Sequence, residues 1–428
     1  MTKDRPVKIL LTGASFSGNL GAEAMYDSIV DELRKYIRYL DIYVLSKYPL
    51  DDEEGCQRRG YKLISFPTIY QFIFGGWFYI FGGLLKMLHL PHRWMAGKRM
   101  EAFYACDILV DASGISFTDD RTFLNVLINT LWFLPGVISG IPMVKVSQSL
   151  GPYKKNYVRI LANMVMKHMD VIICRGQTSY DYTRKFLKSP NIYNLPDTAF
   201  CLVPEDQENT SRILKERGLV RGKYIAVGPS FVMRDYMEKD VYVELLINSI
   251  EELGRRTDMP FVLIPHSWQH SIQFGVDSVN EDYSVCRSIA EKLSPEIPCV
   301  VIDVKLSARE FKSIIGDSYM AIGSRYHFLV ASLSSGVPSM ALGWSHKYRE
   351  LFAEFDISDY VLEYWSMDKE SVLALAIRLY LHRNQLYEKI NNVLNDVKMR
   401  SAQNEMFIVK CLEAKGILNE TQFFKDKT

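Results

Sequence analysis

The chain lacks the features of a nucleic-acid-binding protein and of a disulfide-stabilised secreted protein. Lys and Arg total 51 and Asp and Glu total 50, so the formal net charge is +1, whereas a general nucleic-acid binder carries a clear basic excess. The seven cysteines form no Cys-x-x-Cys pair, and several stand in apolar segments, which favours buried reduced thiols. A metal site is not expected, because His266 and His270 have no third ligand near them in the sequence.

Two further absences concern targeting and membranes. The N-terminus passes directly into a short strand pattern, without the apolar core of a signal peptide, so we expect a cytoplasmic enzyme. Residues 71–90 are strongly apolar, but two Gly-Gly pairs, Lys86 and His89 interrupt them, and a membrane-spanning helix needs about 20 apolar residues. Two interpretations stay open for this stretch: a buried or lid helix, and a surface helix that dips into the inner face of the membrane.

Strand and helix patterns alternate along most of the chain. Residues 7–13 are a continuous apolar run, as in a strand buried on both faces, and an amphipathic helix pattern follows at 22–39. The turn between them lacks Gly-x-Gly-x-x-Gly, which argues against a nicotinamide cofactor. A chain of 428 residues exceeds one core, so we expect an α/β protein with two Rossmann-like domains facing a cleft. The predicted domains are 1–205 with an apolar insertion at about 70–95, then 206–365, then a helical C-terminal extension at 366–428.

Polar or glycine-bearing turns follow at least four predicted strands of the first domain. One turn holds Ser113 and Gly114, another spans 147–152, and a third begins at Arg175. In the second domain His266 follows a strand. Ligands of doubly wound sheets bind at the carboxyl ends of the strands, so we expect these residues to line a ligand cleft. The alternative for His266 is an ordinary surface loop.

Residues 321–347 carry the most informative pattern, a strand–helix–strand–helix order typical of a parallel βαβ unit. Ser324, Arg325 and His327 stand at the start of its first helix. An arginine fork, an imidazole and helix N–H groups suit an anionic substrate that needs a proton moved. The alternative is that Arg325 only caps the sheet edge and His327 is an ordinary helix histidine.

Together with the other strand ends, this unit resembles the polysaccharide pyruvyltransferase family. The motifs that carry the resemblance are 18–24, 111–116, 148–152, Arg175 with Ser179, 196–199, 324–327 with 336–338, and Lys347. The resemblance implies a GT-B-like fold. It also implies transfer of pyruvate from phosphoenolpyruvate to two hydroxyls of a polysaccharide repeat unit, which forms a cyclic ketal and releases phosphate. No cofactor is implied beyond the donor substrate.

The resemblance also implies roles for particular residues. Arg325 and Arg175 would hold the two anionic groups of phosphoenolpyruvate, and His327 would supply or accept a proton. The remaining expected substrate-binding residues are Asn19, Gly21, Glu23, Ser113, Gly114, Ser324, His266 and Lys347.

The expected partners are phosphoenolpyruvate and a saccharide acceptor, lipid-linked in one interpretation, with peripheral membrane contact through 71–90 and no nucleic acid. Two other functions stay open. One is a GT-B glycosyltransferase using a nucleotide sugar, and the other is a non-catalytic assembly protein. The sequence does not identify the acceptor sugar.

Overall fold

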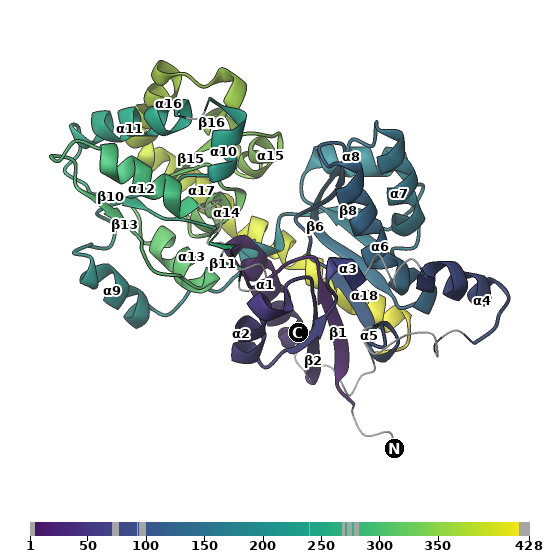
Figure 1. Cartoon of the computed structure of the whole chain (residues 1–428). Helices are drawn as coiled ribbons and strands as arrows, with labels where there is room; N and C mark the ends of the chain where they lie inside the picture. Colours follow the sequence, from purple (N-terminus) through teal and green to yellow (C-terminus); the bar gives the residue numbers. More distant parts are fainter. Residues whose placement is uncertain are drawn as a thin grey trace. The chain divides into compact units, whose positions relative to one another are not determined.

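The computed structural model describes residues 5–70, 77–91, 93, 100–238, 240–267, 270–271, 276–277 and 282–418. These residues form two compact units (Figure 1). Unit 1 comprises the described residues of 1–17, 25–198 and 400–428, and unit 2 comprises those of 18–24 and 199–399. The domain boundaries given above, and a cleft between the domains, stay predictions.

Unit 1 is built on one parallel sheet, with the strand order β3-β2-β1-β4-β6-β7-β8 and β5 paired to β6. Its strands are β1 (Val7–Thr12), β2 (Leu40–Ser46), β3 (Lys62–Ser65), β4 (Ile108–Asp111), β5 (Ile115–Thr118), β6 (Met143–Gly151), β7 (Val171–Cys174) and β8 (Ile192–Asn194). The central strands β4, β6 and β7 are buried throughout. This explains their continuous apolar character, because helices cover both faces of a parallel sheet.

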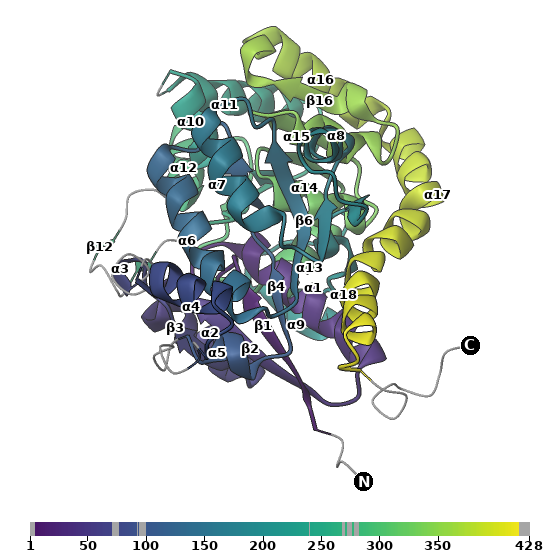
Figure 2. The ribbon, with the colours of Figure 1, turned by 90° about the vertical axis from the view of Figure 1, so that its right-hand side faces the viewer.

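The helices of unit 1 connect these strands in the expected alternation. They are α1 (Leu20–Tyr36, whose first residues belong to unit 2), α2 (Pro49–Arg59), α3 (Thr68–Tyr70), η2 (Phe78–Gly82), α4 (Gly83–Met87), α5 (Ala102–Ala105), α6 (Phe123–Ser139), α7 (Asn156–Met166) and α8 (Gln177–Phe186). Helices α6 and α7 pack side by side (Figure 2). The buried core joins Leu109 of β4, Phe117 of β5 and Trp132 of α6.

The last helix, α18 (Gln403–Ala414), packs on β6 and β7 of unit 1 although it lies far from them in sequence (Figure 1). Asn404 donates to the carbonyl of Pro196 at 3.0 Å, and Glu405 accepts from the Thr198 hydroxyl. Burial raises the pKa of Glu405 well above its usual value, which favours the neutral form of this carboxyl. A neutral acid with a hydroxyl partner explains how α18 buries it against the sheet.

Unit 2 repeats the design with a second parallel sheet, ordered β13-β10-β9-β14-β15-β16. Its strands are β9 (Ile225–Gly228), β10 (Phe261–Leu263), β13 (Cys299–Val301), β14 (Met320–Gly323), β15 (Ser339–Gly343) and β16 (Val361–Glu363), with an antiparallel pair β11 (His270–Ser271) and β12 (Val276–Asp277) outside the sheet. Its helices are η4 (Thr198–Cys201, of which Thr198 belongs to unit 1), α9 (Gln207–Glu216), α10 (Phe231–Tyr236), α11 (Val241–Gly254), α12 (Asp282–Lys292), α13 (Ala308–Gly316), α14 (Tyr326–Ser334), α15 (Lys347–Ala353), η5 (Ser358–Tyr360), η6 (Tyr364–Ser366), α16 (Lys369–Leu381) and α17 (Arg383–Ser401, which ends in unit 1).

The structure confirms the predicted α/β class, the two parallel sheets and the helical C-terminal part. The sequence analysis did not predict β5 and β16, which are only four and three residues long and therefore leave little periodic signal. Of the apolar stretch 71–90, residues 71–76 lie outside the described residues. Among the helices that the structure describes, none combines the length and the apolar character needed to cross a membrane.

Candidate functional site

The turn between β14 and α14 in unit 2 holds the predicted Ser-Arg-Tyr-His motif. Gly323 ends β14 and Gly228 ends the neighbouring β9, and a Cβ at either glycine would lie about 2.5 Å from the Phe328 ring. Phe328 therefore packs directly on both strand ends, which sets how α14 leaves the sheet. Ser324 is buried: its hydroxyl accepts from Tyr242 at 2.7 Å and its carbonyl from Tyr348 at 2.9 Å. Its observed contacts fix the turn, and the substrate-binding role expected for it stays a prediction.

Arg325 is held by a carboxylate that the sequence analysis did not identify. Its Nε and Nη2 donate to the two carboxylate oxygens of Asp282 at 2.8 and 2.6 Å. Burial disfavours the charge, but the attraction and hydrogen bonds of Asp282 outweigh it, so the pKa of Arg325 lies above its ordinary value. Only the Nε–Nη2 edge of the guanidinium is used by these two bonds. The geometry leaves the Nη1–Nη2 edge as a second two-donor edge, which matches a carboxylate or phosphate.

His327 is the second residue of α14 and lies against the start of α1. A Cβ on Gly21 would lie 2.2 Å from the Nδ1 atom of His327, so only glycine at position 21 allows the imidazole this position. Both residues belong to unit 2. The first turns of α1 and α14 are therefore in direct contact, and the substrate-binding role expected for Gly21 stays a prediction.

His266 stacks on His327 with parallel rings, 6.2 Å between centroids and 6° between planes. It is buried, and neither of its ring nitrogens has a hydrogen-bond partner among the residues that the structure describes. Burial, followed by the charges of Arg325 and His327, lowers the pKa of His266 well below its usual value, so the ring is neutral at pH 7. Buried polar atoms without partners are uncommon, and a catalytic role is one of the explanations for them. The surface-loop interpretation of His266 is therefore wrong.

The first turn of α1 places Asn19 and Glu23 in the same unit. The Asn19 side chain accepts from the backbone N–H of Gly21 at 3.0 Å and so caps the helix. Glu23 is buried and accepts from the backbone N–H of Ala308 at 3.2 Å, at the start of α13, where a helix dipole favours negative charge. Their observed contacts are structural, and their proposed contact with an acceptor stays a prediction.

A small cavity lies beside His327, lined by residues of α1, α13, α14 and the segment 199–202. Its volume is about 10 Å³ for the centre of a water-sized sphere, which is about the space of one water molecule. It is therefore too small to be the binding site of a phosphoenolpyruvate molecule.

Lys312 lines this cavity and is 3% exposed. Its ammonium donates to the carbonyls of Leu202 at 2.7 Å and Phe200 at 3.3 Å. Burial, followed by the positive charges of Lys398 and Arg309, lowers the pKa of Lys312 to about 7. The sequence analysis did not single out this lysine.

Lys347 begins α15 in an aromatic environment. Its ammonium lies 3.7 Å from the ring centroid of Trp344 and 5.3 Å from that of Tyr348. Cation–π contacts of this kind hold a partly desolvated ammonium in place. These contacts do not test the substrate-binding role expected for Lys347, which stays a prediction.

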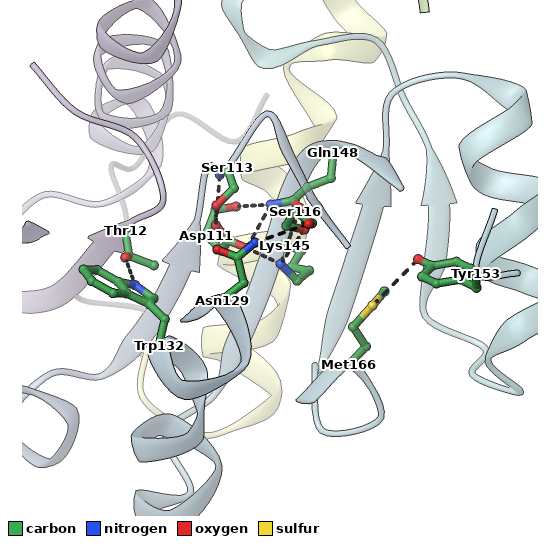
Figure 3. A network of polar contacts seen from close by, with 10 residues as sticks. All are labelled: Thr12, Asp111, Ser113, Ser116, Asn129, Trp132, Lys145, Gln148, Tyr153 and Met166. Atoms are coloured by element: carbon green, nitrogen blue, oxygen red, sulfur yellow. Dashed lines mark hydrogen bonds and ion pairs between the residues drawn. The ribbon is translucent and has the colours of Figure 1, made fainter. Parts of the chain in front are cut away.

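In unit 1 the predicted turn residues join a buried polar network (Figure 3). Asp111, at the end of β4, accepts from the buried Lys145 ammonium and from the Gln148 amide at 2.9 Å. The Ser113 hydroxyl and backbone N–H both donate to Asp111, at 2.5 and 2.9 Å. These two hydrogen bonds of Ser113 stabilise the turn that leads to Gly114. The substrate contacts expected of Ser113 and Gly114 stay predictions.

Arg175, at the end of β7, is buried within unit 1. It donates to the Asp197 carboxylate at 2.5 Å, to the Gly114 carbonyl at 2.9 Å and to the Ser149 hydroxyl at 3.2 Å. These bonds bring together three of the turns that the sequence analysis placed at one sheet edge. The role of Arg175 in holding an anion stays a prediction.

No cluster of three or more potential metal ligands occurs in the described ranges of the chain. Three charged residues that organise these sites, Asp282, Lys145 and Lys312, were missing from the sequence-based candidates. Each stands in an ordinary strand or helix pattern, and no motif or local spacing singles it out.

Comparison with known families identifies the chain's relatives. A family model described as polysaccharide pyruvyl transferase matches residues 19–346. The amylovoran biosynthesis protein AmsJ of Erwinia amylovora is 21% identical over 444 residues, which cover 96% of this chain and 97% of AmsJ.

Solved structures show where else this fold occurs. A putative UDP-N-acetylglucosamine 2-epimerase from Listeria monocytogenes superposes with a TM-score of 0.59 at 12% identity, covering 98% of this chain and 99% of that one. Anabaena HepE in complex with UDP and glucose gives 0.56 at 12% identity, covering 95% and 100%. At such low identity the likeness shows the fold alone, which is the GT-B-like arrangement of Rossmann-like sheets predicted above.

We predict that Gly21→Ala destabilises the protein by about 1–3 kcal/mol, because the new methyl group overlaps the His327 ring. Denaturant unfolding of the purified variant measures this difference. Gly83→Ala is the matched control, since no atom lies within 4 Å of the added Cβ, and it should be neutral or slightly stabilising. Equal stability of the Gly21→Ala variant and the wild type would show that the ring moves aside without cost.

We predict that Lys312→Met reduces the pH dependence of stability between about pH 7 and pH 10. The folded pKa of Lys312, about 7, lies below the ordinary 10.5, so the unfolded state binds more protons in this window and wild-type stability rises with pH. The variant should lose on the order of 3 kcal/mol of that rise.

Denaturant unfolding at both ends of the pH window tests the Lys312 prediction. Lys223→Met, at an exposed position of unit 2, is the control and should follow the wild type. Parallel pH profiles for Lys312→Met and the wild type would contradict the prediction.

Proposed function

We propose that this chain, which belongs to the polysaccharide pyruvyl transferase family, transfers pyruvate from phosphoenolpyruvate to two hydroxyls of a saccharide. Its match to the family model spans the motifs at both the start of α1 and the start of α14. The single observation that carries the proposal is Arg325, fixed by Asp282 at the start of α14 beside His327. A positioned guanidinium and an imidazole at one helix N-terminus suit an anionic donor that must be protonated.

The proposed chemistry has two stages. A proton adds to the methylene carbon of phosphoenolpyruvate while one sugar hydroxyl attacks the central carbon and loses its own proton. The second hydroxyl then displaces phosphate from that carbon and also loses a proton, which leaves the cyclic ketal and inorganic phosphate. His327 would deliver the first proton or accept one from a hydroxyl.

Arg325 supports this scheme through its geometry. Asp282 uses one edge of the guanidinium, and the Nη1–Nη2 edge has the two-donor spacing that a carboxylate or phosphate requires. Because Asp282 already orients the side chain, binding the donor costs little additional rotamer entropy. We assign Arg325 to one anionic group of phosphoenolpyruvate and keep Arg175 as the proposed partner of the other.

His266 supports the scheme through its unpartnered ring. Its two buried nitrogens, which have no partner in the described part of the chain, would each gain a hydrogen bond from a polar substrate group or an ordered water. A neutral imidazole at that position adds no second positive charge beside His327. We therefore propose that His266 contacts the donor or the attacking hydroxyl, with Ser324 and Lys347 supporting the turn and helix on either side.

We propose that the acceptor is a repeat unit of an extracellular polysaccharide, lipid-linked during assembly, and that the enzyme works in the cytoplasm. The relative AmsJ is named for the biosynthesis of amylovoran, which supports a polysaccharide pathway. Asn19, Gly21 and Glu23 are the proposed acceptor side of the site, with Ser113 and Gly114 as further proposed contacts.

A nucleotide-sugar glycosyltransferase is the second candidate. The GT-B-like fold favours it, and HepE was solved in complex with UDP and glucose. The fold by itself does not select the chemistry. The family match and the Arg325–His327 arrangement favour pyruvyl transfer.

His327→Ala should lower the rate of acceptor-dependent phosphate release from phosphoenolpyruvate by about 10²–10⁴-fold, because a general acid or base is removed. The assay uses polysaccharide from the producing organism, stripped of its ketals by mild acid, as acceptor. The control is His382→Ala, since His382 is exposed on unit 2 and pairs with Tyr360. Wild-type rates in the His327→Ala variant would remove the mechanism while leaving the family assignment intact.

Phosphoenolpyruvate should raise the melting temperature of the wild type, whereas UDP-sugars should not. At a ligand concentration of about 100 times Kd the stabilisation is about 2.7 kcal/mol, which is readily measured. Arg325→Lys should abolish most of the shift, because lysine lacks the two-donor edge. Arg349→Lys, at an exposed pair with Glu363, should keep it. A shift with UDP-sugars alone would favour the glycosyltransferase instead.

A further inference from the structure

A helical segment of unit 1 exposes an apolar face. Residues 77–87 form one continuous helical segment through η2 and α4, and a turn follows at 88–89. Seven of its large apolar side chains are at least 40% exposed: Trp77, Ile80, Phe81, Leu84, Met87, Leu88 and Leu90. Soluble surfaces rarely gather this many apolar side chains in one place, and such patches mark interaction sites.

The inner face of the same segment is firmly packed. Phe78 is buried in the core of unit 1 with Trp132 and Ile138, and Lys86 donates to the carbonyl of Val137 at 2.6 Å. Figure 1 shows α4 at the outer edge of unit 1. The exposed residues are therefore presented outward by a segment whose other side is anchored to α6.

The stretches of sequence that contain this segment and the helices beside it carry basic but no acidic residues. Residues 66–100 contain no Asp or Glu, and neither do 122–169, which include α6 and α7. Burial lowers the pKa of His168, and the positive charges of Lys167 and Lys86 lower it as well. Both ammonium groups therefore lie near His168, and Lys86 belongs to α4. The carboxylate nearest to this segment in sequence, Glu101, is paired with Arg93.

We propose that residues 77–90 form an interfacial membrane-binding surface, with the apolar face in the outer acyl region of a bilayer and the basic side chains on anionic lipid headgroups. Stacked Trp77 and Phe81 rings, 4.8 Å apart, are of the type that settles at the headgroup level. A helix with an apolar face and flanking lysines lies in the plane of the interface rather than crossing the bilayer. A surface that binds a protein would be expected to carry hydrogen-bonding and acidic side chains. Residues 66–100 contain no acidic side chain.

Vesicle co-sedimentation of the full-length chain tests this surface, without phosphoenolpyruvate or acceptor, so its result is independent of the transfer chemistry. The wild type should sediment with vesicles of phosphatidylcholine mixed with phosphatidylglycerol, less with phosphatidylcholine alone, and less at high salt. Ile80→Asp/Leu84→Asp should weaken binding by about tenfold or more, because two inserted side chains become charged. The matched control, Leu381→Asp/Met399→Asp, changes two residues of unit 2 that are 70% and 65% exposed, and should bind as the wild type does.

Fluorescence provides a second measurement that needs no charged substitution. The difference between wild-type and Trp77→Phe emission should shift to shorter wavelength on addition of the mixed vesicles. No sedimentation of the wild type with either vesicle, or equal binding by Ile80→Asp/Leu84→Asp, would overturn the proposal. Self-association through this face, abolished by Ile80→Asp/Leu84→Asp in a chain that ignores vesicles, would overturn it in favour of a second copy. Equal binding to both vesicle types would overturn the anionic-lipid preference.

Discussion

The buried carboxylate of Asp282 organises the site in unit 2. It accepts hydrogen bonds from the backbone N–H groups of Phe231 and Ser267, at 2.8 and 3.0 Å, and from the Arg325 fork. One fully buried group thus connects the segments that follow β9, β10 and β14. Removing one partner of a buried ion pair leaves an uncompensated charge and costs roughly 3–5 kcal/mol, so the turn that carries Arg325 and His327 depends on this contact.

Unit 1 also has buried ion pairs at the carboxyl edge of its own sheet. The Asp111–Lys145 and Asp197–Arg175 pairs are buried there, and each also engages neighbouring turns. Buried ion pairs add little net stability compared with apolar packing. Their value in this protein lies in orienting the strand-end turns, which carry Ser113 and Gly114 in unit 1 and the α14 start in unit 2.

The fold of this chain is shared with proteins of other families, so the fold does not identify its chemistry. UDP-sugar epimerases and HepE have the same type of two-sheet framework. The family assignment instead follows the motifs at 19–346, in which a glycine at position 21 makes room for His327. This contact couples the first turn of α1 to the start of α14, although the two are separated by about 300 residues of sequence.

The sequence by itself determined the α/β class, the parallel sheets and the position of the Ser-Arg-Tyr-His motif. Strands buried on both faces must be continuous apolar runs, and strand-end turns need small or polar residues, so both leave a local signal. Only the tertiary structure paired Arg325 with Asp282, buried the His266 ring against His327 and enclosed Lys312 among carbonyls. Those contacts join residues far apart in the chain, and burial, which sets their charge states, depends on packing that no local pattern encodes.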